Sequence, residues 1–177
     1  MTDEAHLTAP ATLEIFRSLP APPERVWQYL TDPELRQQWF CAGATGTAAG
    51  EEFVMDFDHS RLSTSAPPDD AGCGDPVVMK GTILKITPPH ELSYGWPDEH
   101  GGHTVVTIRL SAEGSGTRLH LQHSKLDNPG FRSAASAGWH AHLDLLCDLV
   151  DGVPTRDFWQ HYATLKQHYE QRAASLS

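Results

Sequence analysis

The chain has 177 residues, of which 39% are hydrophobic and 20% charged, and 13 basic against 23 acidic residues give a formal net charge of −10. This length favours one domain with a proper core, and the composition excludes a disordered tail, a collagen-like fibre and a bundle of membrane helices. A chain this acidic is repelled by phosphate backbones and anionic lipids, so we expect neither nucleic acid nor a membrane as a partner.

The N-terminal residues and the cysteines bear on the compartment. The first residues are acidic where a signal peptide needs a basic start and an apolar run. Cys41, Cys73 and Cys147 form no CxxC motif and cannot all pair, which favours reduced thiols. We therefore expect a cytoplasmic protein.

The first part of the chain predicts a strand and two short helices. We expect residues 1–10 to be flexible, and the alternation of apolar and polar residues over 11–18 predicts a strand with one buried face. Pro22 and Pro23 suit the first turn of a helix, because the missing N–H has no partner there. Asp32 before a proline is typical of an N-cap, so a second short helix should begin there.

The middle of the chain predicts an antiparallel meander. Five segments with period-two alternation or short turns between them are expected to be consecutive strands: 51–58, 76–89, 91–97, 103–111 and 117–126. The polar loop 59–75 between the first two has almost no apolar anchor, so we expect it to be among the least stable parts of the fold. It either gates a binding site or is a solvated insertion.

The last third changes to helical spacing. Apolar residues at steps of three and four predict a long helix over 131–151 and an additional C-terminal helix over 154–175. The second helix carries a stripe that either packs on the domain or pairs with another subunit in a homodimer: Phe158, Tyr162, Leu165 and Tyr169.

The order of these elements predicts an α+β domain over 11–177. A long meander must cover its dry face, and the helix 131–151 is the element long enough to lie across it. We therefore expect a helix-grip fold, in which a curved antiparallel sheet wraps around a long C-terminal helix, with two short helices after the first strand. A curved sheet around one helix tends to leave a cavity between them, so the architecture suggests a container.

Two segments resemble a known family. PAPPERVWQYLTDPELRQQWF is similar to the opening signature of the SRPBCC superfamily, and GWHAHLDLLCDLVDG resembles its closing helix. The likeness spans about residues 11–170 and is nearest to the branch named after the activator of the Hsp chaperone ATPase. It implies the START-like or birch-pollen-allergen-like helix-grip fold, which hosts transporters, cyclases, hydrolases and chaperone activators.

No motif for catalysis, a cofactor or a metal is present. The chain has no GxSxG elbow, no P-loop, no GxGxxG and no zinc-type spacing, so we expect no cofactor and no metal. His140 and His142 point apart on a helix, and His120 and His123 face opposite sides of a strand. We expect most of the eleven histidines to be solvated or capping.

The inward faces of the expected elements supply the candidate site. A ligand pocket is typically apolar with a few converging polar groups, and His123 and Tyr94 interrupt apolar strand faces. The alternative for each of these residues is that it packs in the hydrophobic core and contacts no ligand. We expect ligand entry past Trp39, beside the flexible segment 41–50. The predicted ligand-binding residues are Trp39, Phe40, Met55, Phe57, Tyr94, Trp96, Ile108, Leu121, His123, Trp139, His142, Leu143 and Leu146.

Three functions follow as hypotheses. The first is binding of a small hydrophobic or amphipathic molecule in the cavity under the long helix, without catalysis. The second is an enzyme of cyclase or hydrolase type that uses His123 and Tyr94 as acid–base groups. The third, implied by the resemblance, is regulation of a chaperone ATPase; since the sequence lacks the extra N-terminal domain of the eukaryotic activators, we do not expect a chaperone partner.

Overall fold

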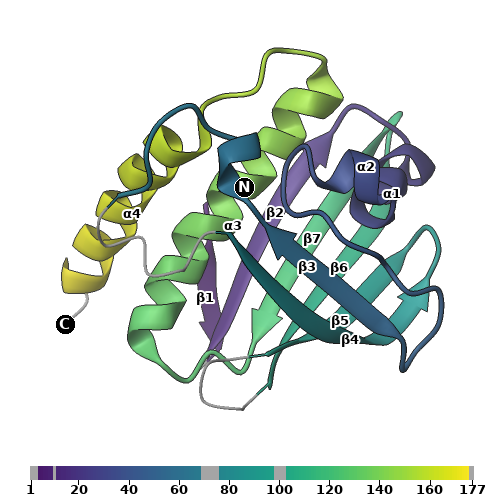
Figure 1. The fold of residues 1–177 in the computed structure, drawn as a ribbon, viewed down its shortest axis with the longest axis horizontal. Coiled ribbons are helices and arrows are strands. Elements are labelled where there is room, and N and C mark those ends of the chain that lie inside the picture. Colours follow the sequence, from purple (N-terminus) through teal and green to yellow (C-terminus); the bar gives the residue numbers. More distant parts are fainter. Residues whose placement is uncertain (1–3, 10, 69–75, 98–102, 176–177) are drawn as a thin grey trace.

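The computed structural model describes residues 4–9, 11–68, 76–97 and 103–175, which form one antiparallel sheet and its helices (Figure 1). The sheet order is β1-β2-β7-β6-β5-β4-β3. The strands are β1 (His6–Ala9), β2 (Thr12–Leu19), β3 (Glu52–Phe57), β4 (Val77–Thr87), β5 (Glu91–Pro97), β6 (His103–Glu113) and β7 (Gly116–Ser124). The helices are α1 (Pro23–Thr31), α2 (Pro33–Arg36), the 3-10 turn η1 (His59–Arg61), α3 (Pro129–Asp151) and α4 (Phe158–Ser175).

The predicted helix-grip fold is confirmed. Figure 1 shows α3 lying across one face of the curved sheet, with the two short helices after β2 near one end of it. Alternation places one set of side chains under α3: Leu119, Leu121 and His123 of β7 are buried, whereas the residues between them are half-buried. On β3, Phe53, Met55 and Phe57 are likewise buried, and the residues between them are half-buried.

The helix boundaries follow the capping residues. The Asp32 carboxylate accepts from the Glu34 backbone N–H, as the Asp-Pro pair predicted. The Asn128 side chain caps α3 in the same manner, so this helix begins at Pro129, two residues before the predicted start. Gly152, with φ of 69°, ends it in the left-handed conformation.

Two N-terminal and loop predictions need correction. The segment 1–10, expected to be flexible, contains strand β1, which pairs with β2. The loop 59–75 starts with η1, and its next residues are bound to α4: the Ser63 hydroxyl and the Thr64 N–H both donate to Asp157, at 2.6 and 2.8 Å. Residues 69–75 lie outside the described residues. The start of this loop is therefore anchored, contrary to expectation.

Helix α4 packs alongside α3, against one side of it (Figure 1). The stripe predicted for it is buried, which selects packing within the domain: Phe158, Tyr162, Leu165 and Tyr169. On this side Asp144 of α3 accepts from Arg17 of β2 at 2.8 Å, from His161 at 2.7 Å and from Arg156 at 3.0 Å. One carboxylate thus joins the sheet, α3 and α4.

Candidate functional site

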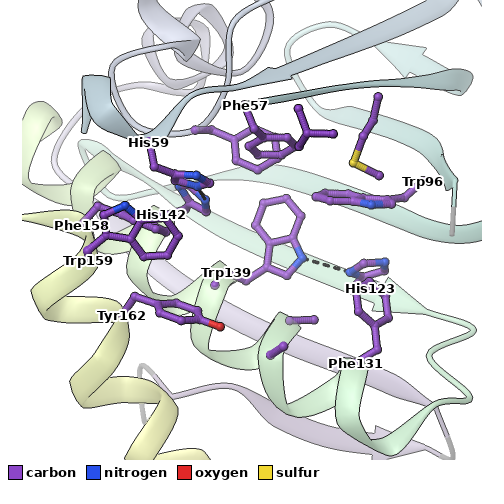
Figure 2. Close-up of a pocket in the computed structure, with 16 residues that line it drawn as sticks. Phe57, His59, Trp96, His123, Phe131, Trp139, His142, Phe158, Trp159 and Tyr162 are labelled. Atoms are coloured by element: carbon purple, nitrogen blue, oxygen red, sulfur yellow. Dashed lines mark hydrogen bonds between the residues drawn. The ribbon is translucent and has the colours of Figure 1, made fainter. Parts of the chain in front are cut away.

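A cavity of about 190 Å³ lies between the sheet, the inner face of α3, η1 and the start of α4 (Figure 2). It exists because α3 presents small residues here: Ala134, Ala135 and Gly138 leave space that longer side chains would fill. The cavity is lined by Phe40, Phe57, His59, Val77, Met79, Trp96, His123, Phe131, Ala134, Ala135, Gly138, Trp139, His142, Phe158, Trp159 and Tyr162.

The exposure of the lining residues locates the mouth. Val77 and Met79 at the start of β4 are half-buried, as are Phe131 and its neighbours in the first half of α3, whereas most of the aromatic lining is buried. The cavity therefore opens between β4 and the first half of α3. The expected entry past Trp39 is wrong: this side chain is 1% exposed, and its indole N–H donates to the Tyr29 carbonyl.

Aromatic rings in mutual contact form the cavity wall. The Phe40 ring lies 4.9 Å from Trp139, 5.1 Å from Phe57 and 5.1 Å from His142, measured between ring centroids. Trp96 closes the same group at 5.8 Å from both Phe57 and Trp139. Stacked and edge-to-face pairs at these distances hold one another in place, so the wall is preformed.

A buried arginine fixes the backbone that carries Phe40. Arg36 is 1% exposed and donates to the carbonyls of Cys41, Gly43 and Val54, at 3.1, 2.7 and 2.8 Å. These bonds tie the segment after α2 to β3. Gly43 adopts φ of 103°, and a Cβ there would lie 2.7 Å from the Val54 carbonyl oxygen, so glycine is required at this turn.

His123 is held neutral at one end of the cavity. The Trp139 indole N–H donates to His123 Nδ1 at 3.0 Å, so Nε2 carries the ring proton and donates to the Thr104 hydroxyl at 2.7 Å. Burial lowers the pKa of His123 to about 3. Both ring nitrogens are used, and the arrangement orients the Trp139 ring against the cavity.

His59 and His142 form the other polar group of the wall. Figure 2 shows their rings together beside Phe158, on the opposite side of Trp139 from His123. His142 Nδ1 lies 2.7 Å from the Trp39 carbonyl oxygen, and the two Nε2 atoms are 3.4 Å apart. Burial, with the charge of His59 as a second cause, holds the pKa of His142 well below its usual value.

None of the sixteen described lining residues is Lys, Arg, Asp or Glu. Within the described ranges, no three His, Cys, Asp or Glu side chains group closely enough to hold a metal ion. No described helix is both long and apolar enough to span a membrane. The cavity thus offers aromatic faces and the buried imidazoles of His123 and His142, whose pKa values burial lowers.

The structure divides the predicted ligand-binding residues into two sets. Six line the cavity: Phe40, Phe57, Trp96, His123, Trp139 and His142. The other seven are buried in the surrounding core instead: Trp39, Met55, Tyr94, Ile108, Leu121, Leu143 and Leu146.

The predicted pairing of His123 with Tyr94 is not found at the cavity. Tyr94 is fully buried and stacks on Phe53 with centroids 4.1 Å apart, and it is not among the lining residues. Its hydroxyl has no hydrogen-bond partner among the described residues. Burial raises the pKa of this phenol well above its usual value, which removes it further from acid–base work near neutral pH.

Sequence reasoning missed the contribution of η1 and α4. His59 was placed in a solvated loop, yet it is 5% exposed and stacks on Phe158 with centroids 4.4 Å apart. Trp159 and Tyr162 complete this wall. The aromatic stripe of the last helix was the available signal, since a stripe that packs on the domain can also reach its cavity.

A family model and one solved structure match this chain over most of its length. The family model described as "Activator of Hsp90 ATPase homolog 1-like protein" matches residues 20–151. A protein from Bordetella parapertussis, solved by NMR, is 34% identical; the alignment covers 95% of this chain and 88% of that chain, with a TM-score of 0.81. A search of the curated proteins found no match.

Two more distant neighbours share the fold alone. CalU16 from Micromonospora echinospora is 24% identical over 98% of this chain and 94% of its own, with a TM-score of 0.68. The Aha1 dimer from Colwellia psychrerythraea is 15% identical over 78% of this chain and 95% of its own, with a TM-score of 0.60. Both therefore support the helix-grip architecture.

Proposed function

This chain belongs to the activator of Hsp90 ATPase homolog 1-like family, and we propose that it binds a small, uncharged, largely aromatic molecule in the cavity. The proposal is based on the cavity because this fold hosts many functions. The observation that carries this proposal is the preformed aromatic wall around about 190 Å³ of space. Dry apolar cavities of about 150 Å³ bind benzene, so this one suits one or two fused rings.

The charge of the ligand follows from the wall. An anion would enter a low-dielectric site without a cationic partner, and a buried charge without a partner is costly. His123 and His142 cannot supply the positive charge near pH 7, because burial lowers the pKa of both. An uncharged aromatic ring meets only complementary faces.

Titration with naphthalene tests the proposal. Three tryptophans line the cavity, so occupancy should change the intrinsic fluorescence: Trp96, Trp139 and Trp159. We expect saturable binding of naphthalene and at least tenfold weaker binding of 2-naphthoate, which has the same rings with a carboxylate. Absence of binding for every uncharged one- and two-ring compound would contradict the proposal.

A variant that fills the cavity tests whether naphthalene binds there. A Cβ added at Gly138 meets no atom within 4 Å, so this position can take a side chain that projects into the cavity. Gly138→Leu should weaken naphthalene binding at least tenfold while the melting temperature stays the same or rises, because glycine is a poor residue inside a helix. Gly138→Ala should keep binding. Equal affinity in the leucine variant would place the ligand elsewhere.

Homodimerisation stays a prediction for this chain. The neighbour from Colwellia psychrerythraea is described as a dimer. In this chain the aromatic stripe of α4 is already buried against its own domain, so a dimer would need another surface. Light scattering of the purified protein distinguishes the two states.

A further inference from the structure

We propose that the histidine pair His59–His142 recognises a hydroxyl group on the ligand, which makes hydroxylated aromatic compounds of the phenol class the preferred occupants of the cavity. This inference rests on the proposed function, because it concerns the same cavity. It is carried by the positions of the ring protons and by the distance between the two rings.

The contact with Trp39 determines where the proton of His142 lies. A backbone carbonyl oxygen only accepts hydrogen bonds, so His142 Nδ1, 2.7 Å from it, must carry the ring proton. Because burial keeps this imidazole neutral, its Nε2 is an acceptor. The facing His59 Nε2 must then be the donor of their contact. The pair presents one donor and one acceptor side by side.

The contact between the rings is long. The two Nε2 atoms are 3.4 Å apart, whereas good N–H hydrogen bonds in proteins fall at about 2.7–3.2 Å. A hydroxyl oxygen that approaches both nitrogens can accept from His59 and donate to His142 at the same time. Ethers and carbonyls can only accept, and a carboxylate meets the penalty described above. A hydroxyl is uncharged, and its single oxygen both donates and accepts, so it satisfies both rings.

Packing holds the pair in this geometry. The His59 ring stacks on Phe158 with centroids 4.4 Å apart, and the His142 ring lies 4.5 Å from Phe158. Figure 2 shows both imidazoles on the α4 side of the cavity, with Trp139 between them and His123. A flat ring lying along Trp139 would bring a substituent at its edge to the two Nε2 atoms. His123 is not an equivalent partner, because both its nitrogens make short hydrogen bonds, at 2.7 and 3.0 Å, whereas the contact between His59 and His142 is long.

The test compares three ligands of one ring system: 2-naphthol, 2-methoxynaphthalene and naphthalene. We expect the native protein to bind 2-naphthol at least tenfold more tightly than 2-methoxynaphthalene at pH 7. In His59→Phe, which keeps the stacking on Phe158, the affinity for 2-naphthol should fall at least tenfold more than the affinity for naphthalene does. The melting temperature of the variant reports separately that it is folded, and equal losses for the two ligands would overturn the role of His59.

A measurement on the native protein does not depend on any variant. The ¹⁵N shifts of the imidazole Nε2 atoms of His59 and His142 should change on adding 2-naphthol and much less with naphthalene, and those of His123 should stay constant. Equal affinities for 2-naphthol and 2-methoxynaphthalene, or equal shifts with all three ligands, overturn the hydroxyl preference and leave the proposed function intact. Failure of all three to bind overturns the proposed function itself.

Discussion

The two sides of helix α3 carry histidines two residues apart in opposite environments. On the inner side His142 lies among aromatic rings, and no described lining residue of the cavity is Lys, Arg, Asp or Glu. On the side next to β2 and α4, His140 lies 3.4 Å from Asp144, which also binds two arginines. The chain thus keeps its charges where they join structural elements and leaves the cavity to weak, shape-dependent contacts. This separation allows the two sides to be altered independently.

The largest change in the free energy of unfolding is expected from Asp144, on the charged side of α3. Although burial raises the pKa of Asp144, the hydrogen bond from His161 and the charge of Arg17 lower it to about 2, so the carboxylate is ionised and bonded. Asp144→Asn removes the carboxylate that pairs with Arg17, whose side chain is 4% exposed. Loss of one partner of a buried pair costs about 3–5 kcal/mol. Urea denaturation should show a loss near 3 kcal/mol, since Asp144 itself is partly exposed.

An exposed ion pair provides the control for this variant. Lys80 and Glu52 are 3.2 Å apart and both more than half exposed. Lys80→Met should change the free energy of unfolding by less than about 1 kcal/mol, because solvent screens such pairs. If Asp144→Asn were as mild as Lys80→Met, the charged network around Asp144 would not join α4 to the domain.

The second largest effect, a loss of about 2 kcal/mol in the free energy of unfolding as the pH falls, is expected from His123 on the cavity side. The folded pKa of His123, about 3, lies below the unfolded value of about 6.5, so the unfolded chain binds more protons as the pH falls below about 6.5. Stability should therefore decrease from that pH downward, and His123 contributes about 2 kcal/mol of loss by pH 5. The measurement is the free energy of unfolding at pH 7 and pH 5.

His123→Gln isolates this contribution. A glutamine amide can accept from the Trp139 indole and donate to the Thr104 hydroxyl without titrating. The variant should lose about 2 kcal/mol less than the native protein between pH 7 and pH 5. An unchanged pH dependence would mean that His123 is not neutral in the folded state.

Much of the fold could be predicted because it depends on local patterns. Alternation placed Phe53, Met55 and Phe57 on one buried face, and the pair Asp32–Pro33 marked the start of α2. Strand β1 could not be predicted in this way. Its four residues carry no usable pattern, and they are a strand because β2 pairs with them.

The site was harder to predict because a cavity is a property of packing. Periodicity shows which side chains face α3, but not where along α3 the space remains. That place depends on small residues such as Ala135 and Gly138, so inward residues such as Leu143 and Leu146 were indistinguishable from lining residues. His59 was missed because its burial requires Phe158, which is distant in the sequence and meets it through the packing of α4.

The smallest change in the free energy of unfolding is expected at the start of α4, where the two sides of α3 meet. Asp157 accepts from the Gln160 N–H and from the Ser63 hydroxyl, so it caps α4 and binds the segment after η1 at once. The hydrogen bond from Ser63 is the largest cause that lowers the pKa of Asp157. Asp157→Ala should cost about 1 kcal/mol, as loss of a helix cap does.

This variant also tests whether the segment after η1 affects the cavity. With the cap removed, His59 and Phe158 lose a constraint that holds them together, so dissociation of naphthalene should become faster even though no lining residue has changed. Asp157→Asn, which keeps an acceptor for the cap, should restore most of the stability and the slow dissociation. Stopped-flow fluorescence measures the rate. An unchanged dissociation rate in Asp157→Ala would show that the loop contributes to stability alone and does not gate the cavity.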